Sequence, residues 1–466
     1  MSKPNTFRFS HALLLVVALM AMMNSALFAQ SAVTGAINGT VSDPAGAVIS
    51  NATITIKSVG TNKEQTATTT GEGSFKFSNL QPGTYTVTVA APGFAEFKLT
   101  QVVVEVGRAT NVEAGMRVAG SGESVQVIAD AGLVNTENKE FTSNINQTSI
   151  NELPINGRRW SNFAILTPSV VPDGSFGLLS FRGISGLLNN NTVDGGDNNQ
   201  AFFGEERGRT RISYSISQSA IREFQVNTSN YSAEYGRAAG GVTNAVTKSG
   251  TNDLHGDAFY FQRNNEWGAR NPLAFQSVLN NGVSSVVGIK PEDVRHQFGG
   301  TLGGPIAKDK LFFFFSYDQQ KRNFPGLGIF TQPTYLNTVN RTALTGAPRN
   351  LTNQQIDDTL AFLNSLTGTV PRRGDQIILL PKVDWQINSK NTFTATYNRL
   401  RWDSPAGIQT QATNTRGRAS FGDDYVDVDW FTGRLTSTVS SRVVNEFRFQ
   451  IARDLEYQIS QKPLPG

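Results

Sequence analysis

Short runs in which apolar and polar residues alternate occupy much of the chain. Alternation with a period of two is typical of a β-strand with one buried face, because successive side chains point to opposite sides. The first group of runs covers residues 52–56, 74–77, 84–89 and 102–106. Turn signals accompany them at Asp43-Pro44, Gly71-Glu-Gly73, Pro82-Gly83 and Pro92-Gly93, where Pro presets φ and Gly accepts a positive φ. This spacing predicts a small antiparallel β-sandwich over residues 34–118.

Longer alternating runs follow in the second half of the chain, at residues 383–387, 393–397, 426–430 and 447–451. In each run one side is apolar or aromatic and the other is polar. This pattern suits a transmembrane barrel strand, with lipid outside and an aqueous or plugged lumen inside. Val426, Val428 and Trp430 are therefore expected to face lipid. Asp427 and Asp429 would then face the lumen, although a soluble sandwich alternates in the same way.

Residues 251–466 have room for about eight to ten strands, at roughly nine to eleven residues per strand. Plugged outer-membrane transporters use about 22 strands, and the chain ends at Pro463-Leu-Pro-Gly466 without an aromatic-ended strand. We therefore expect residues 251–466 to be the N-terminal portion of a β-barrel, in a chain that is a fragment. Several aromatic side chains are expected to form interfacial girdles: Phe259, Tyr260, Trp385, Tyr397 and Trp430.

The first 29 residues have the three parts of a secretory signal peptide. Lys3 and Arg8 form a positive n-region, residues 12–23 form an apolar h-region, and residues 25–29 form a cleavage zone. We predict cleavage after Ala29. The apolar run is shorter than the roughly 20 residues that a transmembrane helix needs, and no later segment has 18 consecutive apolar residues. A membrane role would therefore require a barrel.

The composition argues against several functional classes. Removing residues 1–29 takes away two of the 41 basic residues and none of the 37 acidic ones, so the net charge becomes 39 − 37 = +2. This charge gives no case for nucleic acid as a partner. The chain has no Cys, and only His255 and His296 remain after cleavage, so the usual nucleophile–base and zinc arrangements are missing. We expect no catalytic residues, no metal site and no cofactor, in a protein that is not an enzyme.

Four motifs in the first module carry a family resemblance. They are GTVSDPAG at residues 39–46, ATI at 52–54, GEGSF at 71–75 and LQPGTY at 80–85. In this order they resemble the carboxypeptidase regulatory-like domain, which is an accessory module without catalytic residues. The resemblance implies a carbohydrate-binding-like fold and makes a glycan one candidate ligand. A spacer or adaptor role is favoured, because the exposed-looking aromatics are only Tyr85, Phe94 and Phe97, and Phe94 follows a Pro-Gly turn that a core side chain often closes.

A second resemblance covers residues 131–250. Its motifs are Glu152-Leu-Pro-Ile-Asn-Gly-Arg-Arg159, Phe181-Arg182-Gly183, Val193-Asp194-Gly195, Tyr235-Gly236 and Gly240-Gly241-Val242. In order and spacing they resemble the plug domain of TonB-dependent receptors of the Oar-like type. The residue chemistry agrees, because Val-Asp-Gly is a hairpin turn and adjacent glycines let two backbones approach closely. Two stretches depart from the pattern, Asn-rich residues 189–200 and charged residues 202–217, and we expect ligand-facing loops there.

A Gly-Ser-Gly break at residues 120–122 separates the two modules. The segment that follows it alternates like an extended strand and consists of Glu123, Ser124, Val125, Gln126, Val127, Ile128 and Ala129. Within the linker 119–130, this segment resembles a TonB box, which pairs by strand addition with the periplasmic TonB-type energy-coupling protein. The same alternation also fits a last strand of the sandwich, and the sequence leaves both interpretations open.

Together these patterns predict a mainly β protein, with a β-sandwich, an α+β plug and part of an antiparallel transmembrane β-barrel. They favour a TonB-dependent outer-membrane receptor or transporter that takes up a ligand and is energised from the inner membrane. The alternative is a non-transporting surface protein that binds a glycan or a protein partner. The expected location is the cell outer membrane. The expected partners are the TonB-type protein, outer-membrane lipid and an external ligand, for which carbohydrate is one candidate.

Overall fold

The computed structural model describes residues 33–119, 125–128 and 141–461, apart from short gaps at 175–176, 202–204, 208–211, 232–234, 271, 273–274, 281–282, 333, 409–412 and 441–442. The predicted cleavage site at Ala29 lies outside these residues. The fold is mainly β, as predicted, and has three parts. Within the described part of the chain, no helix is long and apolar enough to cross a membrane.

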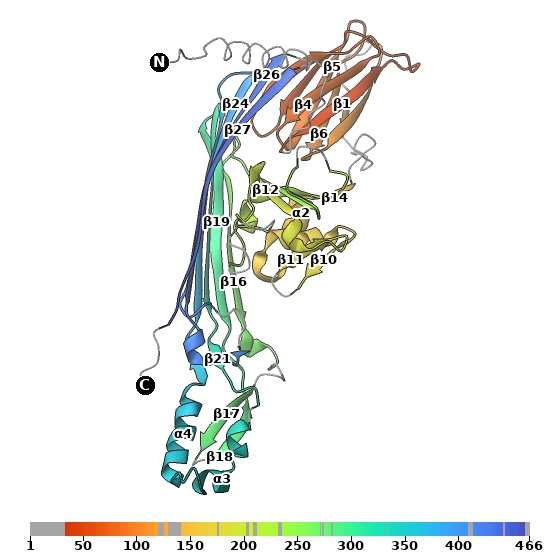
Figure 1. Cartoon of the computed structure of the whole chain (residues 1–466). Coiled ribbons are helices and arrows are strands. Elements are labelled where there is room, and N and C mark those ends of the chain that lie inside the picture. The colour runs from red at the N-terminus through yellow and green to blue at the C-terminus, as the bar shows by residue number, and fades with distance from the viewer. Residues whose placement is uncertain are drawn as a thin grey trace, which may run out of the picture.

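The first part is the β-sandwich, drawn in red and orange in Figure 1. One sheet has the order β4-β1-β7 and consists of β1 (Gly35–Ser42), β4 (Ser74–Leu80) and β7 (Ala109–Gly115). The other has the order β3-β2-β5-β6-β8 and consists of β2 (Thr53–Ser58), β3 (Glu64–Thr68), β5 (Gly83–Ala90), β6 (Phe97–Val104) and β8 (Val125–Ile128). Alternate side chains of the two sheets, among them Ile37, Ile54 and Val87, are fully buried in one cluster. The alternation in the sequence therefore forms the core of the sandwich.

The second part is the domain expected to be the plug. Its main sheet has the order β13-β12-β15-β14-β9. These strands are β9 (Phe141–Ile145), β12 (Asn190–Val193), β13 (Gly196–Asp197), β14 (Ile221–Ser229) and β15 (Val242–Thr247). The domain also has a hairpin of β10 (Val170–Asp173) and β11 (Leu178–Phe181), and the short helices α2 (Gln147–Glu152), η1 (Asn156–Arg158), η2 (Trp160–Leu166), η3 (Gly186–Leu188) and η4 (Gln218–Ala220). This mixture has the α+β character that was predicted.

The third part is one antiparallel sheet of seven strands in the order β16-β19-β20-β23-β24-β26-β27. They are β16 (His255–Asn264), β19 (Val294–Ala307), β20 (Leu311–Asn323), β23 (Arg373–Gln386), β24 (Asn391–Ser404), β26 (Asp423–Ser440) and β27 (Val443–Ile459). Strands of 10 to 18 residues can cross an outer membrane. The expectation of about eight to ten such strands is wrong for the described residues, because long connections use part of the sequence for other structure.

The two ends of this sheet differ. At one end, short turns join β19 to β20 and β23 to β24. At the other end, long connections hold β17 (Phe275–Asn280), β18 (Val283–Gly288), β21 (Gly326–Gly328), β22 (Gly368–Val370), β25 (Thr413–Asn414), η5 (Asn265–Trp267), η6 (Tyr335–Thr338), η7 (Arg418–Ser420), α3 (Arg341–Thr345) and α4 (Asn353–Ser365). Outer-membrane barrels have short periplasmic turns and longer external loops. The sandwich lies at the short-turn end in Figure 1, which is the periplasmic end if the sheet belongs to the predicted outer-membrane barrel.

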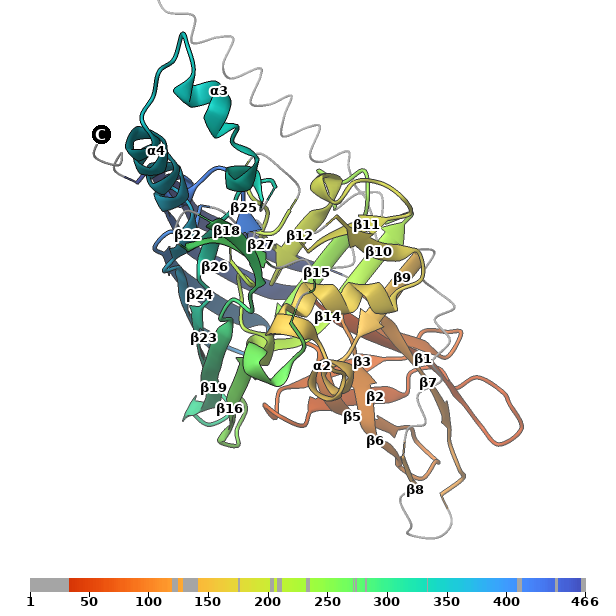
Figure 2. The same cartoon turned by 90° about the horizontal axis from the view of Figure 1, so that it is seen from below.

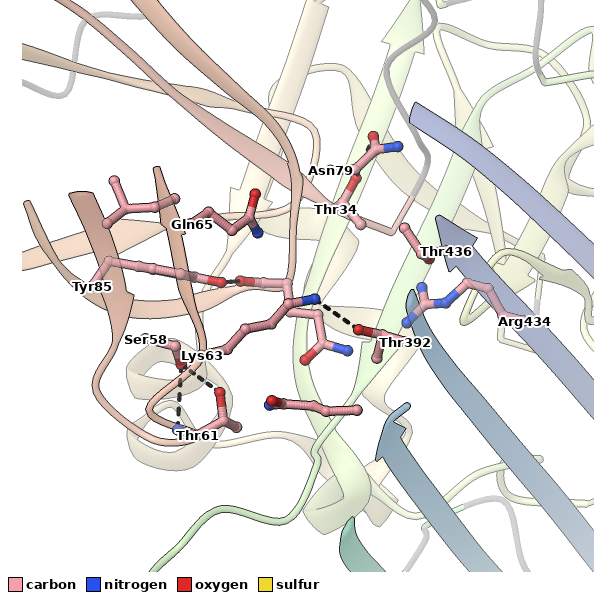
Figure 3. Close-up of a pocket in the computed structure, with 13 residues that line it drawn as sticks. Thr34, Ser58, Thr61, Lys63, Gln65, Asn79, Tyr85, Thr392, Arg434 and Thr436 are labelled. Carbon is pink, nitrogen blue, oxygen red and sulfur yellow. Dashed lines mark hydrogen bonds between the residues drawn. The ribbon is translucent and has the colours of Figure 1, made fainter. Parts of the chain in front are cut away.

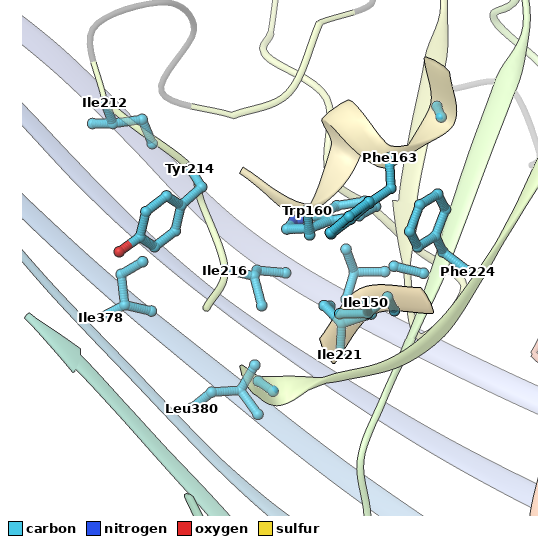
Figure 4. Close-up of a cluster of buried hydrophobic side chains, with 14 of the residues drawn as sticks. Ile150, Trp160, Phe163, Ile212, Tyr214, Ile216, Ile221, Phe224, Ile378 and Leu380 are labelled. Carbon is cyan, nitrogen blue, oxygen red and sulfur yellow. The ribbon is translucent and has the colours of Figure 1, made fainter. Parts of the chain in front are cut away.

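The plug packs against the concave inner face of the seven-stranded sheet, as Figure 2 shows. One continuous cluster of buried side chains joins Trp160, Phe163 and Phe224 of the plug to Ile378 and Leu380 of β23 (Figure 4). Trp160 and Phe224 meet edge to face, with their ring centroids 5.4 Å apart. The plug and the inner wall of the barrel therefore share one hydrophobic core.

The prediction of which side chains of β26 face lipid is wrong. Val426, Val428 and Trp430 are buried in the core shared with the plug, with exposed fractions of 2% or less. Asp427 and Asp429 alternate with them and lie on the outer face of the sheet. Where the inner wall contacts the core of the plug it can be apolar, so alternation by itself cannot tell which side of a strand faces inward.

The outer face of the neighbouring strands follows the prediction. Trp385 of β23, and Phe447 and Ile451 of β27, are exposed on it. Of the residues expected in the aromatic girdles, Tyr260 is also exposed. Trp430 points inward, and Phe259 contacts Arg158 of the plug, so neither belongs to a girdle.

Candidate functional site

The sandwich meets the barrel through the turn between β2 and β3. Lys63 donates to Thr392 Oγ1 of β24 at 2.7 Å, across a small polar cavity (Figure 3). Asn62 donates to Asp309 Oδ1, in the turn between β19 and β20, at 2.9 Å. Asn252, just before β16, donates to the same oxygen at 2.7 Å. The two hydrogen bonds to Asp309 are exposed, so each stabilises the joint only weakly. The hydrogen bond from Lys63 is partly buried, and Thr392 is a buried residue.

The sandwich also touches the plug, through the residues that follow β6. The Glu223 carboxylate on β14 accepts from the backbone N–H of Val106 at 2.9 Å, and Asn144 of β9 donates to the Val106 carbonyl at 2.9 Å. Gly107 (φ +66) lies so close to Gln225 that an added Cβ would be 2.3 Å from its amide nitrogen. Burial raises the pKa of Glu223 to about 7. This junction therefore contains a carboxyl group that titrates near neutral pH.

Asp194, in the Val-Asp-Gly motif, ties the plug to the barrel wall. It shares the turn between β12 and β13 with Gly195, and both have a positive φ, +48° and +73°, as a two-residue type I′ hairpin requires. The carboxylate accepts from the backbone and side chain of Thr247 at 2.9 and 2.7 Å, and lies 3.6 Å from Lys382 Nζ of β23. Burial alone would raise the pKa of Asp194, but Lys382 and Thr247 hold it below its ordinary value. The plug motif thus supplies a buried anion, and the barrel supplies its cation.

The same hairpin docks on β27 through its backbone. Arg448 donates to the Gly195 carbonyl at 2.7 Å. Gln450 accepts from the N–H of Asp197 at 2.8 Å and donates to its carbonyl at 3.1 Å. A Cβ at Gly195 would be 2.2 Å from Arg448 Nη1. A side chain at this position would displace the Arg448 guanidinium, and the positive φ of Gly195 would strain any residue other than glycine.

The Arg-Gly and Gly-Gly motifs serve packing inside the plug. Arg182 (φ +54) and Gly183 (φ +79) form a tight turn after β11. The Arg182 side chain donates to the carbonyl of Gly240 at 3.4 Å. Gly241 lies against the ring of Phe181, 2.2 Å from where a Cβ would stand. Gly241 therefore leaves room for an aromatic ring, whereas the expectation was a close approach of two backbones.

We predicted that the Asn-rich stretch 189–200 forms a loop that faces the ligand. This prediction is wrong for the residues of the stretch that are buried. Asn190 and Asn199 are buried and hydrogen bonded to each other at 2.8 Å. Asn190 also donates to the carbonyl of Gly236 at 2.8 Å, where Tyr235 is half-buried and Gly236 is exposed. These amides hold the plug together rather than facing the outside.

Residues 202–217 were predicted to form a second loop that faces the ligand. This prediction is also wrong for the part of the stretch that the structure describes. Tyr214 and Ile216 are buried in the core shared by plug and barrel. Tyr214 donates to Asp318 of β20 at 2.6 Å, and Ser217 donates to the same carboxylate at 2.7 Å. The described part of this stretch therefore packs between the plug and the barrel wall. The sequence alone could not show this packing, because the contacting strands are far away in sequence.

Residues 125–128 of the candidate TonB box form β8, whereas Glu123, Ser124 and Ala129 lie outside the described residues. β8 pairs in parallel with β6, from Phe97↔Val125 to Thr100↔Ile128. It is the terminal strand of its sheet, next to β6 on one side. No other described strand pairs with its outer edge. The segment is thus a strand of the sandwich sheet that ends in an open edge.

The sandwich aromatics form no exposed platform for a sugar. Tyr85 and Phe97 are buried, and Phe94 packs against the same core cluster. The Tyr85 hydroxyl donates to the carbonyl of Gln81 at 2.9 Å. The three side chains that were the candidates for glycan contact therefore stabilise the sandwich, as was expected for Phe94.

Comparisons with known families agree with this architecture. Residues 36–117 match the carboxypeptidase regulatory-like domain, and residues 246–377 match an outer membrane beta barrel domain. The first match covers the sandwich strands β1 to β7, and the second runs from β16 into β23. The chain therefore carries a carboxypeptidase regulatory-like domain and a segment of an outer-membrane β-barrel domain, and its location is the outer membrane.

Within this class the chain is a homologue of the TonB-dependent transporter Oar of Myxococcus xanthus. The two sequences are 28% identical over 318 residues, which are 64% of this chain and 28% of that relative. The chain thus matches less than a third of the relative's length.

Two of the solved structures that are similar to the chain are transport proteins of outer membranes by their names. The outer membrane transporter YddB from Escherichia coli has a TM-score of 0.44 at 14% identity, over 67% of this chain and 38% of that one. The siderophore receptor PirA from Pseudomonas aeruginosa has a TM-score of 0.40 at 15% identity, over 68% and 41%.

Proposed function

We propose that this chain belongs to an energy-coupled receptor, which takes up an external ligand through the outer membrane. Homology to a TonB-dependent transporter and a plug seated on the inner wall of a barrel sheet support this function. In such a protein a periplasmic partner from the inner membrane drives the release of the plug.

The observation that carries the proposal is the open edge of β8 at the periplasmic end. A terminal strand leaves a row of backbone N–H and C=O groups unpaired, and an extended partner strand can pair with them. The two interpretations of residues 123–129 then become compatible. The segment is the last strand of the sandwich sheet and also the strand to which a TonB-type protein adds.

The test uses full-length protein in detergent and the periplasmic domain of the TonB-type protein from the same cell. Binding is measured by biolayer interferometry. We expect deletion of residues 123–129 to abolish binding, and Gln126→Pro or Val127→Pro to weaken it strongly. Of two successive N–H groups in a strand, one points toward β6 and the other toward the open edge, and proline removes the donor.

Val127→Thr is the matched control, because it keeps the backbone N–H and a β-branched side chain. It should bind like the unchanged protein. Unchanged binding after the deletion would contradict coupling through this segment. It would favour the alternative, a surface protein that binds its ligand without transport.

A further inference from the structure

Three arginines converge on a cavity between the plug and the barrel wall. The cavity has a volume of about 380 Å³ and lies between plug residues 151–158 and the long-loop ends of β16 and β19. Arg158 comes from the plug, Arg263 from β16 and Arg295 from β19. Among the described lining residues the acidic side chain is that of Glu152, which is exposed. The lining therefore carries an excess of positive charge.

The strand register stacks like charges at this point. Arg263 of β16 is paired with Arg295 of β19, which is paired in turn with Arg322 of β20. Like charges directly opposite each other on neighbouring strands are destabilising. Asp293 compensates Arg322 through two hydrogen bonds of 2.8 and 3.0 Å. In the described part of the chain, Arg158 and Arg295 have no carboxylate within 4.0 Å.

Contacts with other side chains of the protein fix the position of the Arg158 guanidinium. It stacks over Phe259 and Phe261, 4.1 and 4.7 Å from the ring centroids. It also donates to Ser219 Oγ at 2.7 Å. The backbone of Arg158 has φ +57, a value that few residues other than glycine adopt. A strained residue with a fixed side chain at a cavity is a feature of binding sites.

Arg295 reaches the same place from the opposite wall. Its Nη1 atom would be 3.0 Å from a Cβ at Gly157, so the guanidinium lies against the plug backbone. The Nε atoms of Arg158 and Arg295 are both buried and without a hydrogen-bond partner in the structure. A buried charged donor without an acceptor is costly, and an anion would supply the acceptor.

We propose that Arg158, Arg263 and Arg295 bind an oxyanion, namely the carboxylate or phosphate group of a small ligand. Guanidinium groups present paired N–H donors that match the oxygens of such groups. A cavity of about 380 Å³ is in the range of small-molecule sites. The inference rests on the proposed function, because the long-loop end is the side from which an external ligand enters. It narrows that ligand to an anionic one.

Equilibrium dialysis of the full-length protein in detergent tests the site, with radiolabelled inorganic phosphate and radiolabelled citrate as probes. We expect saturable binding of at least one probe, weakened at least about tenfold by Arg295→Gln and by Arg158→Gln. Arg295→Lys keeps the charge without the planar fork and should retain part of the affinity. Arg399→Gln, at an exposed position of β24, is the matched control and should leave binding unchanged.

Heat-modifiable migration on gels verifies that each variant is folded, and Arg295→Lys provides the folded comparison if Arg295→Gln fails. Absence of saturable binding for both probes would overturn the proposal, because the arginines would then be neutralised within the whole protein. Equal weakening by Arg399→Gln would also overturn it, because the attraction would be unspecific. The coupling protein is absent from this assay, so neither result bears on the proposed function.

Discussion

The plug and the sandwich both contact the barrel sheet, but different kinds of interaction hold them there. The plug shares a hydrophobic core with the inner wall and places the buried Asp194 beside Lys382. The sandwich has a core of its own and meets its neighbours through polar side chains and one small cluster of Val33, Val106 and Val246. The difference indicates that plug and barrel unfold together, whereas the sandwich can separate without losing its own fold.

The largest expected effect is that of Phe224→Ala. Phe224 is fully buried against Trp160 in the shared core, so its truncation should lower the free energy of unfolding by about 3–5 kcal/mol. Urea titration of full-length protein in vesicles measures this free energy. Phe77→Ala in the sandwich core is the matched variant and should destabilise only the sandwich. If the barrel of the Phe224→Ala variant unfolded at the same urea concentration as that of the unchanged protein, the claim that plug and barrel unfold together would be contradicted.

Lys382→Met should be nearly as harmful. It leaves the Asp194 carboxylate buried without its cation, which typically costs about 3–5 kcal/mol. Adding Asp194→Asn removes the uncompensated charge, so the double variant should recover much of the loss. The same urea titration measures both proteins. If Lys382→Met left the free energy of unfolding unchanged, solvent or another cation would have to reach Asp194.

The junction between sandwich and plug should depend on pH through Glu223. Its pKa is raised by burial to about 7 in the docked arrangement, so docking favours the protonated carboxyl. The cost of ionising Glu223 is fully present above pH 7 and disappears as the pH falls toward the ordinary glutamate range. Docking should therefore tighten between pH 8 and pH 5, and Glu223→Gln should remove this dependence.

Because the chain has no Cys, dyes can be attached at Glu72→Cys on the sandwich and Lys308→Cys on the barrel rim. Single-molecule energy transfer between the two dyes then reports the docked fraction. A docked fraction that stays constant from pH 5 to pH 8 in the protein with Glu223 intact would contradict a titrating carboxyl at the junction.

The smallest effect is expected for Asn62→Ala. It removes one exposed hydrogen bond to Asp309, worth about 1 kcal/mol or less. The same dye pair measures the change in docking, and Thr66→Ala, at an exposed position of β3, is the control. A change much larger than that of the control would mean that the turn between β2 and β3 is the main attachment of the sandwich.

Features that depend on local sequence could be predicted, and features that depend on distant partners could not. The sandwich strands and the Asp194-Gly195 hairpin follow from alternation and turn chemistry. The outer face of β27 was also predicted, but the face of β26 was assigned wrongly because Val426 to Trp430 are apolar toward the plug. The burial of Tyr214 and the meeting of Arg158 with Arg295 depend on strands far apart in sequence, so no local signal marked them.

One measurement tests most directly whether β8 is the strand to which the coupling protein adds. Because these 466 residues contain no Cys, Gln126→Cys gives this chain a single thiol. Single cysteines can be placed along an edge strand of the TonB-type periplasmic domain. We predict disulfide cross-links at alternate positions of that strand, because side chains on paired strands share a face every second residue. Cross-links at no position, or equally at all of them, would contradict strand addition at β8.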